Sequence, residues 1–155
     1  MLKNKAAVIT GGSRGIGQAI AREFLMEGAE VLLVARTLSE LEATREELSS
    51  LGRVEILAAD VSVRNDVTQV LFMVDSLWGG VDILVNAAAI QGPIGPLTDV
   101  VDAAEWRRVI EVNLFGTFLM IRALAPSMKK HGRGKIINFA GGGEGAYPNF
   151  SAYVA

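Results

Sequence analysis

The sequence predicts a single α/β domain built on a doubly wound parallel sheet, with helices on both faces. Short apolar runs alternate along the 155 residues with longer segments that are apolar at three- and four-residue spacing, which is the pattern of repeated βα units. The runs are almost continuously apolar, as in strands that helices cover on both sides. Neither an internal repeat nor a Pro/Ser-rich linker marks a boundary, so we expect residues 1–155 to form one domain.

Five runs predict strands, and we expect each of them to be buried on both faces. In chain order they are Ala6–Thr10, Val31–Ala35, Val54–Ala58, Ile83–Asn86 and Lys135–Phe139. We expect the strand order 3-2-1-4-5, in which ligands bind beyond the carboxyl ends of the first and fourth strands. Glycine-rich or polar segments follow the first, fourth and fifth strands, at residues 11–17, 86–95 and 141–145.

Four amphipathic segments predict the helices between these strands. They are Ile16–Glu27, Leu38–Leu51, Val63–Trp78 and a long segment from about Ala103 to Lys130. Gly28 and Gly52 suit left-handed C-caps of the first two helices, because glycine adopts that conformation without strain. Pro126 should kink or locally end the long helix, because proline removes a backbone hydrogen bond.

Composition excludes several classes of function. The net charge is only −2 and the charges are interspersed, which argues against a nucleic-acid partner. The longest apolar stretch, Val112–Ile121, is interrupted by Asn113, Gly116 and Thr117, so we expect no membrane span. The N-terminus runs into a strand pattern without a secretory signal, which predicts a cytoplasmic location. With one histidine and no cysteine, nothing resembles a zinc site.

Three glycines between the first strand and the first helix predict a nucleotide-binding loop. In the spacing Gly-x-x-x-Gly-x-Gly, Gly11 permits a sharp turn, Gly15 permits close approach of a pyrophosphate, and Gly17 permits close packing of helix and strand. The helix N-terminus adds amide donors and a positive dipole. A tight turn without a ligand is the alternative. The predicted cofactor-binding residues here are Gly11, Ser13, Arg14, Gly15, Ile16 and Gly17.

Together with five later motifs, this loop resembles that of the short-chain dehydrogenase/reductase family. The motifs are Asp60-Val61, Asn86-Ala87-Ala88-Ala89, Asn113, Ile136-Ile137-Asn138 and Ser151-Ala152-Tyr153. The resemblance spans the whole chain and implies an NAD(P)-binding Rossmann fold. It also implies hydride transfer between a nicotinamide and a small carbonyl or alcohol substrate, of ketone or 3-oxoacyl type. Members of this family commonly form homo-oligomers.

The resemblance also implies cofactor contacts after the third and fourth strands. Asp60 would hold the adenine edge beside Val61, and Asn86, Ala87 and Ala88 would line the crevice under the adenine-proximal ribose. Taken by itself, Asp60 is interpreted as a loop acid before an N-cap at Ser62. An Asn that ends a strand is likewise common turn chemistry.

The end of the second strand predicts the cofactor that is preferred. An acid there would accept hydrogen bonds from the adenosine ribose and repel a 2′-phosphate, but no acid lies between Val31 and Ser39. Arg36 and Arg14 would both face a 2′-phosphate with planar donor groups. We therefore predict NADP(H) in preference to NAD(H). In the alternative, Arg36 is a solvated loop cation.

In the resembling family, Tyr153 would be the general acid/base and Asn113 would hold a water of the proton relay. Because a phenol in water keeps its proton up to about pH 10, the family adds a lysine four residues after the tyrosine. That position falls two residues beyond Ala155, and the last strands and helices would follow it. A core asparagine with all its hydrogen bonds satisfied is the alternative for Asn113.

A second departure from the family pattern favours a non-catalytic alternative. The family places a serine that holds the substrate oxygen thirteen residues before the tyrosine, and this chain has Ala140 there. The backbone amides of 141–143 would be the substitute donors. A nucleotide-binding fragment or pseudoenzyme is therefore the second hypothesis. If the last strands are missing, apolar surface on the fifth strand and the long helix should be exposed and promote association.

Overall fold

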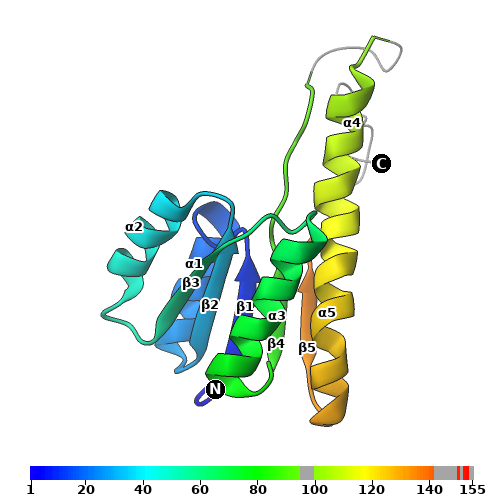
Figure 1. The fold of residues 1–155 in the computed structure, drawn as a ribbon. Coiled ribbons are helices and arrows are strands. Elements are labelled where there is room, and N and C mark those ends of the chain that lie inside the picture. Colours follow the sequence, from blue (N-terminus) through cyan, green and yellow to red (C-terminus); the bar gives the residue numbers. More distant parts are fainter. Residues whose placement is uncertain (95–99, 142–149, 151, 154–155) are drawn as a thin grey trace.

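One five-stranded parallel sheet forms the centre of the fold (Figure 1). The computed structural model describes residues 1–94, 100–141, 150 and 152–153. The sheet order is β3-β2-β1-β4-β5, so the predicted fold class and strand order are confirmed. The strands are β1 (Ala6–Thr10), β2 (Glu30–Ala35), β3 (Val54–Ala58), β4 (Ile83–Asn86) and β5 (Lys135–Asn138).

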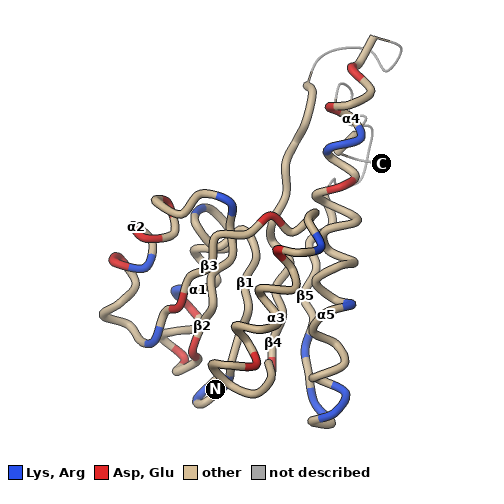
Figure 2. Tube along the Cα trace, in the orientation of Figure 1, with Lys and Arg blue, Asp and Glu red and all other residues tan. Residues whose placement is uncertain are grey.

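Helices cover both faces of the sheet, as a doubly wound fold requires. Helices α1 (Gly15–Met26) and α2 (Leu38–Leu48) pack on one face. The other face carries α3 (Arg64–Trp78) and a long helix made of α4 (Ala103–Ile110), the π-helical segment η1 (Glu111–Gly116) and α5 (Thr117–Lys130). Helix α4 extends past the carboxyl ends of the strands (Figure 1). Helices α1 to α4 each carry both acidic and basic residues, whereas α5 carries only basic ones (Figure 2).

The core consists of two apolar layers, one on each side of the sheet. Along β1, Val8 belongs to the layer under α3 and α5, and Ala7 and Ile9 belong to the layer under α1 and α2. All five residues of β1 are buried. The alternation follows from the two-residue period of a strand, and it explains why a central parallel strand is apolar on both faces.

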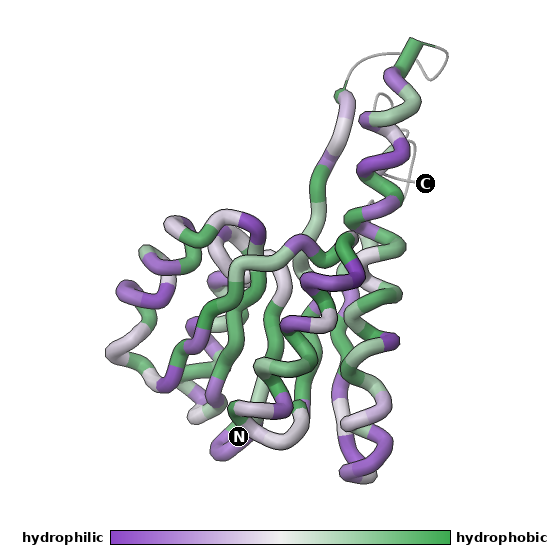
Figure 3. The backbone as a smooth tube through the Cα atoms, in the orientation of Figure 1, coloured by the Kyte–Doolittle hydropathy of each residue, from purple (hydrophilic) through white to green (hydrophobic). Residues whose placement is uncertain are grey.

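The prediction that every strand is buried on both faces is wrong for the two edge strands. No residue of β3 is fully buried, and all four residues of β5 are exposed, including Ile136 at 38% and Ile137 at 39%. Among the described residues, β5 is an edge strand with β4 as its one neighbour. Leu114 and Phe118 of the long helix are exposed as well. The apolar surface expected on the fifth strand and the long helix is therefore present, and both segments contain hydrophobic stretches in Figure 3.

The predicted helix ends are correct for α1 and wrong for α2. Gly28 has a φ of 88° after α1, as a left-handed cap requires. Helix α2 ends at Leu48, four residues before Gly52, which does not have a positive φ. A Cβ on Gly52 would lie 3.1 Å from Cδ2 of Leu25. The glycine at position 52 therefore permits close packing against α1.

The long helix contains an irregular turn before Pro126 and does not end at the proline, and a kink at Pro126 stays a prediction. Helix α5 contains Pro126 and continues to Lys130, so the expected end at the proline is not found. The irregular turn is η1, which contains Asn113. Single π-helical turns of this kind are often found at functional sites.

Residues Ala103–Lys130 form one continuous helix that, by length and apolar composition alone, could cross a membrane. The sequence analysis excluded such a span because Asn113, Gly116 and Thr117 interrupt the stretch, but the helix runs through all three. Its buried side chains, Leu119, Met120 and Leu124 among them, belong to the apolar layer on the sheet. They pack as those of a core helix do.

Candidate cofactor site

A cleft of about 260 Å³ lies beyond the carboxyl ends of β1, β2 and β4. The order of the strands reverses at this point, where ligands bind in open α/β sheets. Of the twelve predicted cofactor-binding residues, Gly15, Asp60 and Asn86 do not line the cleft. The other nine do, and they are Gly11, Ser13, Arg14, Ile16, Gly17, Arg36, Val61, Ala87 and Ala88.

The three glycines of the loop have different environments. A Cβ on Gly11, which has a φ of 64°, would lie 2.7 Å from the carbonyl oxygen of Ala87. A Cβ on Gly17 would overlap the carbonyl group of Gly11. Gly15 has a φ of 57° and no described atom within 4 Å of such a Cβ. Two glycines therefore permit close packing of the loop, and the third leaves the backbone open to a ligand.

The N-terminus of α1 has no acidic partner among the described residues. Its N-cap, Arg14, makes no side-chain capping hydrogen bond, and the first turn contains no acid. In contrast, the Asp102 side chain caps α4 by accepting hydrogen bonds of 2.9 Å from Ala104 N and Glu105 N. Because the first amides of a helix need acceptors, those of α1 are suited to a phosphate group. This donor set fits a dinucleotide pyrophosphate.

Thr10 is a site residue whose role the sequence analysis missed. Its buried hydroxyl accepts hydrogen bonds of 3.1 Å from Ala87 N and Ala88 N, and it donates one of 3.4 Å to the Val85 carbonyl. The segment after β4 is thereby held against the glycine loop. A single hydroxyl at the carboxyl end of an otherwise apolar strand was the signal available in the sequence.

Two arginines and one acid line the same cleft. Neither Arg14 nor Arg36 forms an ion pair within the described part of the chain, although both line the cleft. Glu40 also lines it and accepts a hydrogen bond of 3.0 Å from the Ser13 hydroxyl. Glu40 directly follows the segment from Val31 to Ser39 that contains no acid.

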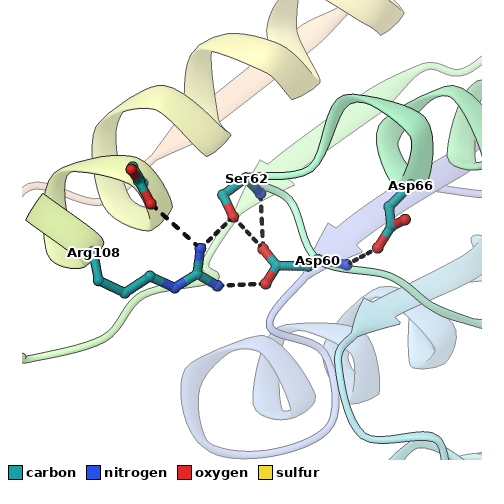
Figure 4. Close-up of polar contacts among 5 residues, drawn as sticks. Asp60, Ser62, Asp66 and Arg108 are labelled. Carbon is teal, nitrogen blue, oxygen red and sulfur yellow. Dashed lines mark hydrogen bonds and ion pairs between the residues drawn. The ribbon is translucent and has the colours of Figure 1, made fainter. Parts of the chain in front are cut away.

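Asp60 is held by a polar cluster at the start of the β3–α3 loop (Figure 4). Its carboxylate accepts hydrogen bonds from Ser62 N at 2.9 Å and from Ser62 Oγ at 2.6 Å, and it pairs with Arg108 of α4. Asp66 accepts a hydrogen bond from Asp60 N at 2.8 Å. The N-cap of α3 is Val63, so the alternative that placed an N-cap at Ser62 is wrong.

The pKa of Asp60 lies below its usual value. Partial burial opposes ionisation of the carboxyl group, but the hydrogen bonds from Ser62 and the guanidinium of Arg108 outweigh it. Asp60 thus links the β3–α3 loop to the long helix, while its neighbour Val61 lines the cleft. The predicted contact of Asp60 with an adenine edge stays a prediction.

Asn86 links β4 to the edge strand. Its Nδ2 donates a hydrogen bond of 2.8 Å to Oδ1 of Asn138. This side-chain bond joins β4 and β5 at their carboxyl ends. The Oδ1 of Asn86 is buried and has no hydrogen-bond partner among the described residues. Only the following residues, Ala87 to Ile90, reach the cleft.

Asn113 positions the segment that follows β4. Its Oδ1 accepts a hydrogen bond from Ile90 N and its Nδ2 donates one to Ile90 O, each at 2.9 Å. The side chain therefore satisfies both backbone groups of Ile90, which lines the cleft. The carbonyl of Asn113 accepts a 2.9 Å hydrogen bond from the Thr117 hydroxyl. These contacts match the alternative of a satisfied core asparagine, and the relay role stays a prediction.

Tyr153 lies next to the backbone that follows β5. A Cβ built on Gly141 would be 2.6 Å from Cε1 of Tyr153 and 3.1 Å from its hydroxyl oxygen. Ala140, immediately before Gly141, is exposed and carries no side-chain donor. The fold thus brings the predicted acid/base residue to the position where the family pattern has a serine. Ser151 and the glycines at 142, 143 and 145 lie outside the described residues.

A scan against family models matches residues 5–155 to the short chain dehydrogenase family. Among curated proteins, the chain is 39% identical to a D-beta-hydroxybutyrate dehydrogenase of Rhizobium meliloti, covering 97% of this chain and 59% of that protein. The chain spans less than two thirds of the length of the curated relatives that it matches first.

Solved structures of this family are similar over 99% of the chain. A metagenomic short-chain oxidoreductase in complex with NADP is 37% identical with a TM-score of 0.92, and the match covers 70% of it. An NAD+-bound xylitol dehydrogenase is 26% identical with a TM-score of 0.93, and the match covers 59% of it. Both nicotinamide cofactors therefore occur among proteins of this fold.

Proposed function

The chain belongs to the short-chain dehydrogenase family, and we propose that its cleft binds a nicotinamide dinucleotide, NADP(H) in preference to NAD(H). The bound cofactor would exchange a hydride with a carbonyl or alcohol carbon of a small molecule. One observation carries this proposal: the glycine loop, the N-terminus of α1 and two arginines line one cleft at the switch point of the sheet.

The donor groups of the cleft support pyrophosphate binding. The N-terminal amides of α1 have no side-chain cap within the described part of the chain, and the backbone at Gly15, which does not itself line the cleft, is open. A negative group placed there gains hydrogen bonds and the favourable end of the helix dipole. Gly11 and Gly17 keep the loop close to β4 and to its own helix, so these donors are preorganised.

The two arginines support the preference for NADP(H). Arg14 follows Ser13 in the glycine loop, Arg36 follows β2, and both line the cleft. Guanidinium groups form strong paired hydrogen bonds to phosphate oxygens. A 2′-phosphate on the adenosine ribose would supply such oxygens, whereas NAD(H) carries a hydroxyl there.

Tyr153 is the residue that we propose to move the proton. In reduction its phenol would donate a proton to the substrate oxygen, and in oxidation the phenolate would accept one. Its position beside Gly141 puts it at the carboxyl end of the sheet, on the same side as the cleft. Asn113 would act indirectly, because it fixes Ile90 in the cleft wall.

A nucleotide-binding protein without catalytic activity is the second candidate, and Ala140 favours it. An alanine at the position of the substrate-orienting serine removes a donor whose loss costs about 2.7 to 4 kcal/mol of transition-state stabilisation. Carbonyl reduction assayed with NADPH distinguishes the candidates. Turnover that Tyr153→Phe abolishes supports the enzyme, and binding without turnover supports the second candidate. In an enzyme, Ala140→Ser should raise kcat on the order of a hundredfold.

Binding is tested by titrating the 155-residue chain with NADPH, NADH and S-adenosylmethionine while monitoring the fluorescence of Trp78 and Trp106. We expect tighter binding of NADPH than of NADH, and no binding of S-adenosylmethionine. Arg36→Asp should weaken NADPH binding about tenfold or more relative to NADH, because one charge-assisted contact is replaced by repulsion. Arg45→Asp, an exposed change on α2 away from the cleft, is the matched control. An unchanged preference in Arg36→Asp would refute the assignment.

A further inference from the structure

We propose that Glu40 is a specificity-determining residue that opposes the two arginines and limits the preference for NADP(H). This inference rests on the proposed function of the cleft. Glu40 is an acid that lines the cleft, although the end of β2 contains no acid. The cofactor group concerned is the adenosine ribose.

Two side chains of α2 hold the same residue of the glycine loop. Thr44 Oγ1 donates a hydrogen bond of 2.8 Å to the Ser13 carbonyl, and Glu40, one turn earlier on the same helix face, accepts one of 3.0 Å from the Ser13 hydroxyl. Thr44 is buried and Glu40 is exposed. The hydrogen bond from the buried Thr44 side chain holds the backbone of the loop at Ser13, independently of the bond to Glu40.

The bond to Glu40 removes a donor from the cleft. A serine hydroxyl carries one proton, and in this structure Ser13 gives it to Glu40. A 2′-phosphate bound near Arg14 and Arg36 would therefore find the Ser13 hydroxyl proton already donated to Glu40. It would also meet the negative charge of the Glu40 carboxylate, which lines the same cleft. Both effects weaken NADP(H) binding.

The same carboxylate does not penalise NAD(H). A ribose with a free 2′-hydroxyl adds no negative charge at that position, and its hydroxyl can donate to a carboxylate. The cofactor preference is then a balance between two cations that favour the 2′-phosphate and one anion that opposes it. Glu40 and Arg36 should accordingly shift the NADP(H)-to-NAD(H) affinity ratio in opposite directions.

The test compares Glu40→Gln with the unchanged chain by isothermal titration calorimetry with NADP+ and with NAD+. We expect NADP+ affinity to rise about fivefold, from the loss of roughly 1 kcal/mol of like-charge repulsion near the surface. NAD+ affinity should stay the same or fall. Because salt screens exposed charges, the gain in NADP+ affinity should shrink when the salt concentration is raised from 0.05 to about 0.5 M.

Two variants separate charge from structure. Glu46→Gln removes the same charge from an exposed position on α2 that does not line the cleft, and it should leave the affinity ratio unchanged. Ser13→Ala breaks the bond to Glu40 but keeps the carboxylate, and it should not raise NADP+ affinity.

Each outcome of the calorimetry is decisive. A higher NADP+-to-NAD+ affinity ratio in Glu40→Gln, absent in Glu46→Gln, supports the inference. An unchanged ratio, or equal losses for both cofactors, overturns it and leaves the proposed function standing. Binding of neither cofactor to the unchanged chain would instead refute the proposed function.

Discussion

The two ends of the sheet differ in whether their charged side chains have partners. At the amino end, the Asp82 carboxylate accepts hydrogen bonds from Ala6 N at 3.1 Å and Lys5 Nζ at 3.3 Å, and it pairs with Arg133 at 2.8 Å. At the carboxyl end, Arg14 and Arg36 line a cleft without an acidic partner among the described residues. The amino end therefore pairs its charges internally, whereas the carboxyl end combines a paired cluster, Asp60 with Arg108, and a cleft whose two arginines are available to a ligand.

The partners of Asp82 at the amino end favour its charged form. Burial opposes ionisation of Asp82, but the Ala6 amide, Lys5 and Arg133 outweigh it and lower the pKa of the carboxyl group. Such a group stabilises the fold. Donors without a partner contribute nothing comparable to stability, but they are available to bind an anion. Substitutions at the amino end should thus change stability alone. Substitutions in the cleft should change cofactor binding, and they should also lower stability where packing or a backbone hydrogen bond is lost, as at Gly17 and Thr10.

The largest effect is expected at Gly17. Gly17→Ala should lower the free energy of unfolding by about 3 kcal/mol and abolish cofactor binding, because a Cβ there overlaps the Gly11 carbonyl. Urea denaturation followed by tryptophan fluorescence measures the loss. Gly15→Ala is the control: it has space for a methyl group and only a positive φ, so it should cost about 1 kcal/mol. Equal losses in the two variants would contradict the packing argument.

Thr10→Val should have the next largest effect, about 2 kcal/mol, because it leaves the half-buried amides of Ala87 and Ala88 without their acceptor. The segment that lines the cleft should shift, so cofactor affinity should fall as well. Thr10→Ser keeps the hydroxyl and should retain most of the affinity. If Thr10→Val binds the cofactor as the unchanged chain does, the hydroxyl does not position this segment.

At the amino end, Asp82→Ala should cost about 1.5 kcal/mol of stability. The substitution removes the hydrogen-bond acceptor of Ala6 N and the anionic partner of Lys5 and Arg133. Cofactor affinity at a temperature where both proteins are folded should not change. Asp75→Ala, an exposed change on α3, should have no measurable effect on stability. A loss of affinity in Asp82→Ala would show that the two ends of the sheet are coupled.

The smallest effect concerns pH. The Asp60 pKa is lowered in the folded state, so its contribution to stability is present above the unfolded value of about 3.9 and is lost as pH falls through the folded value. Arg108→Ala should therefore cost about 1 kcal/mol at pH 7 and much less near pH 3. Arg107→Ala, its exposed neighbour, should cost little at either pH. Denaturation at the two pH values measures both, and a cost independent of pH would argue against the ion pair.

Periodicity and turn residues predicted most of the architecture. The five cleft residues of the glycine loop could be placed because a strand, a tight turn and a helix follow directly in the sequence. Val61, Ala87 and Ala88 were predicted by the family resemblance, and Arg36 by its place at the end of the second strand. The hydrogen bonds of Thr10, Asn113 and Glu40 could not be predicted, because they join segments that only the fold brings together. The exposure of β5 depends on what covers a strand, which local sequence does not specify. The cytoplasmic location and the formation of a homo-oligomer stay predictions.

The exposed edge strand also determines where the sheet opens first. Because β5 has one neighbour and little buried area, its amides should exchange with solvent deuterium faster than those of β1, through local openings that leave the rest of the sheet intact. Each such opening breaks the hydrogen bond between Asn86 and Asn138. Asn86 directly precedes the residues that line the cleft, so local opening at the edge of the sheet should disturb the cofactor site. A bound cofactor should in turn slow deuterium exchange in β5.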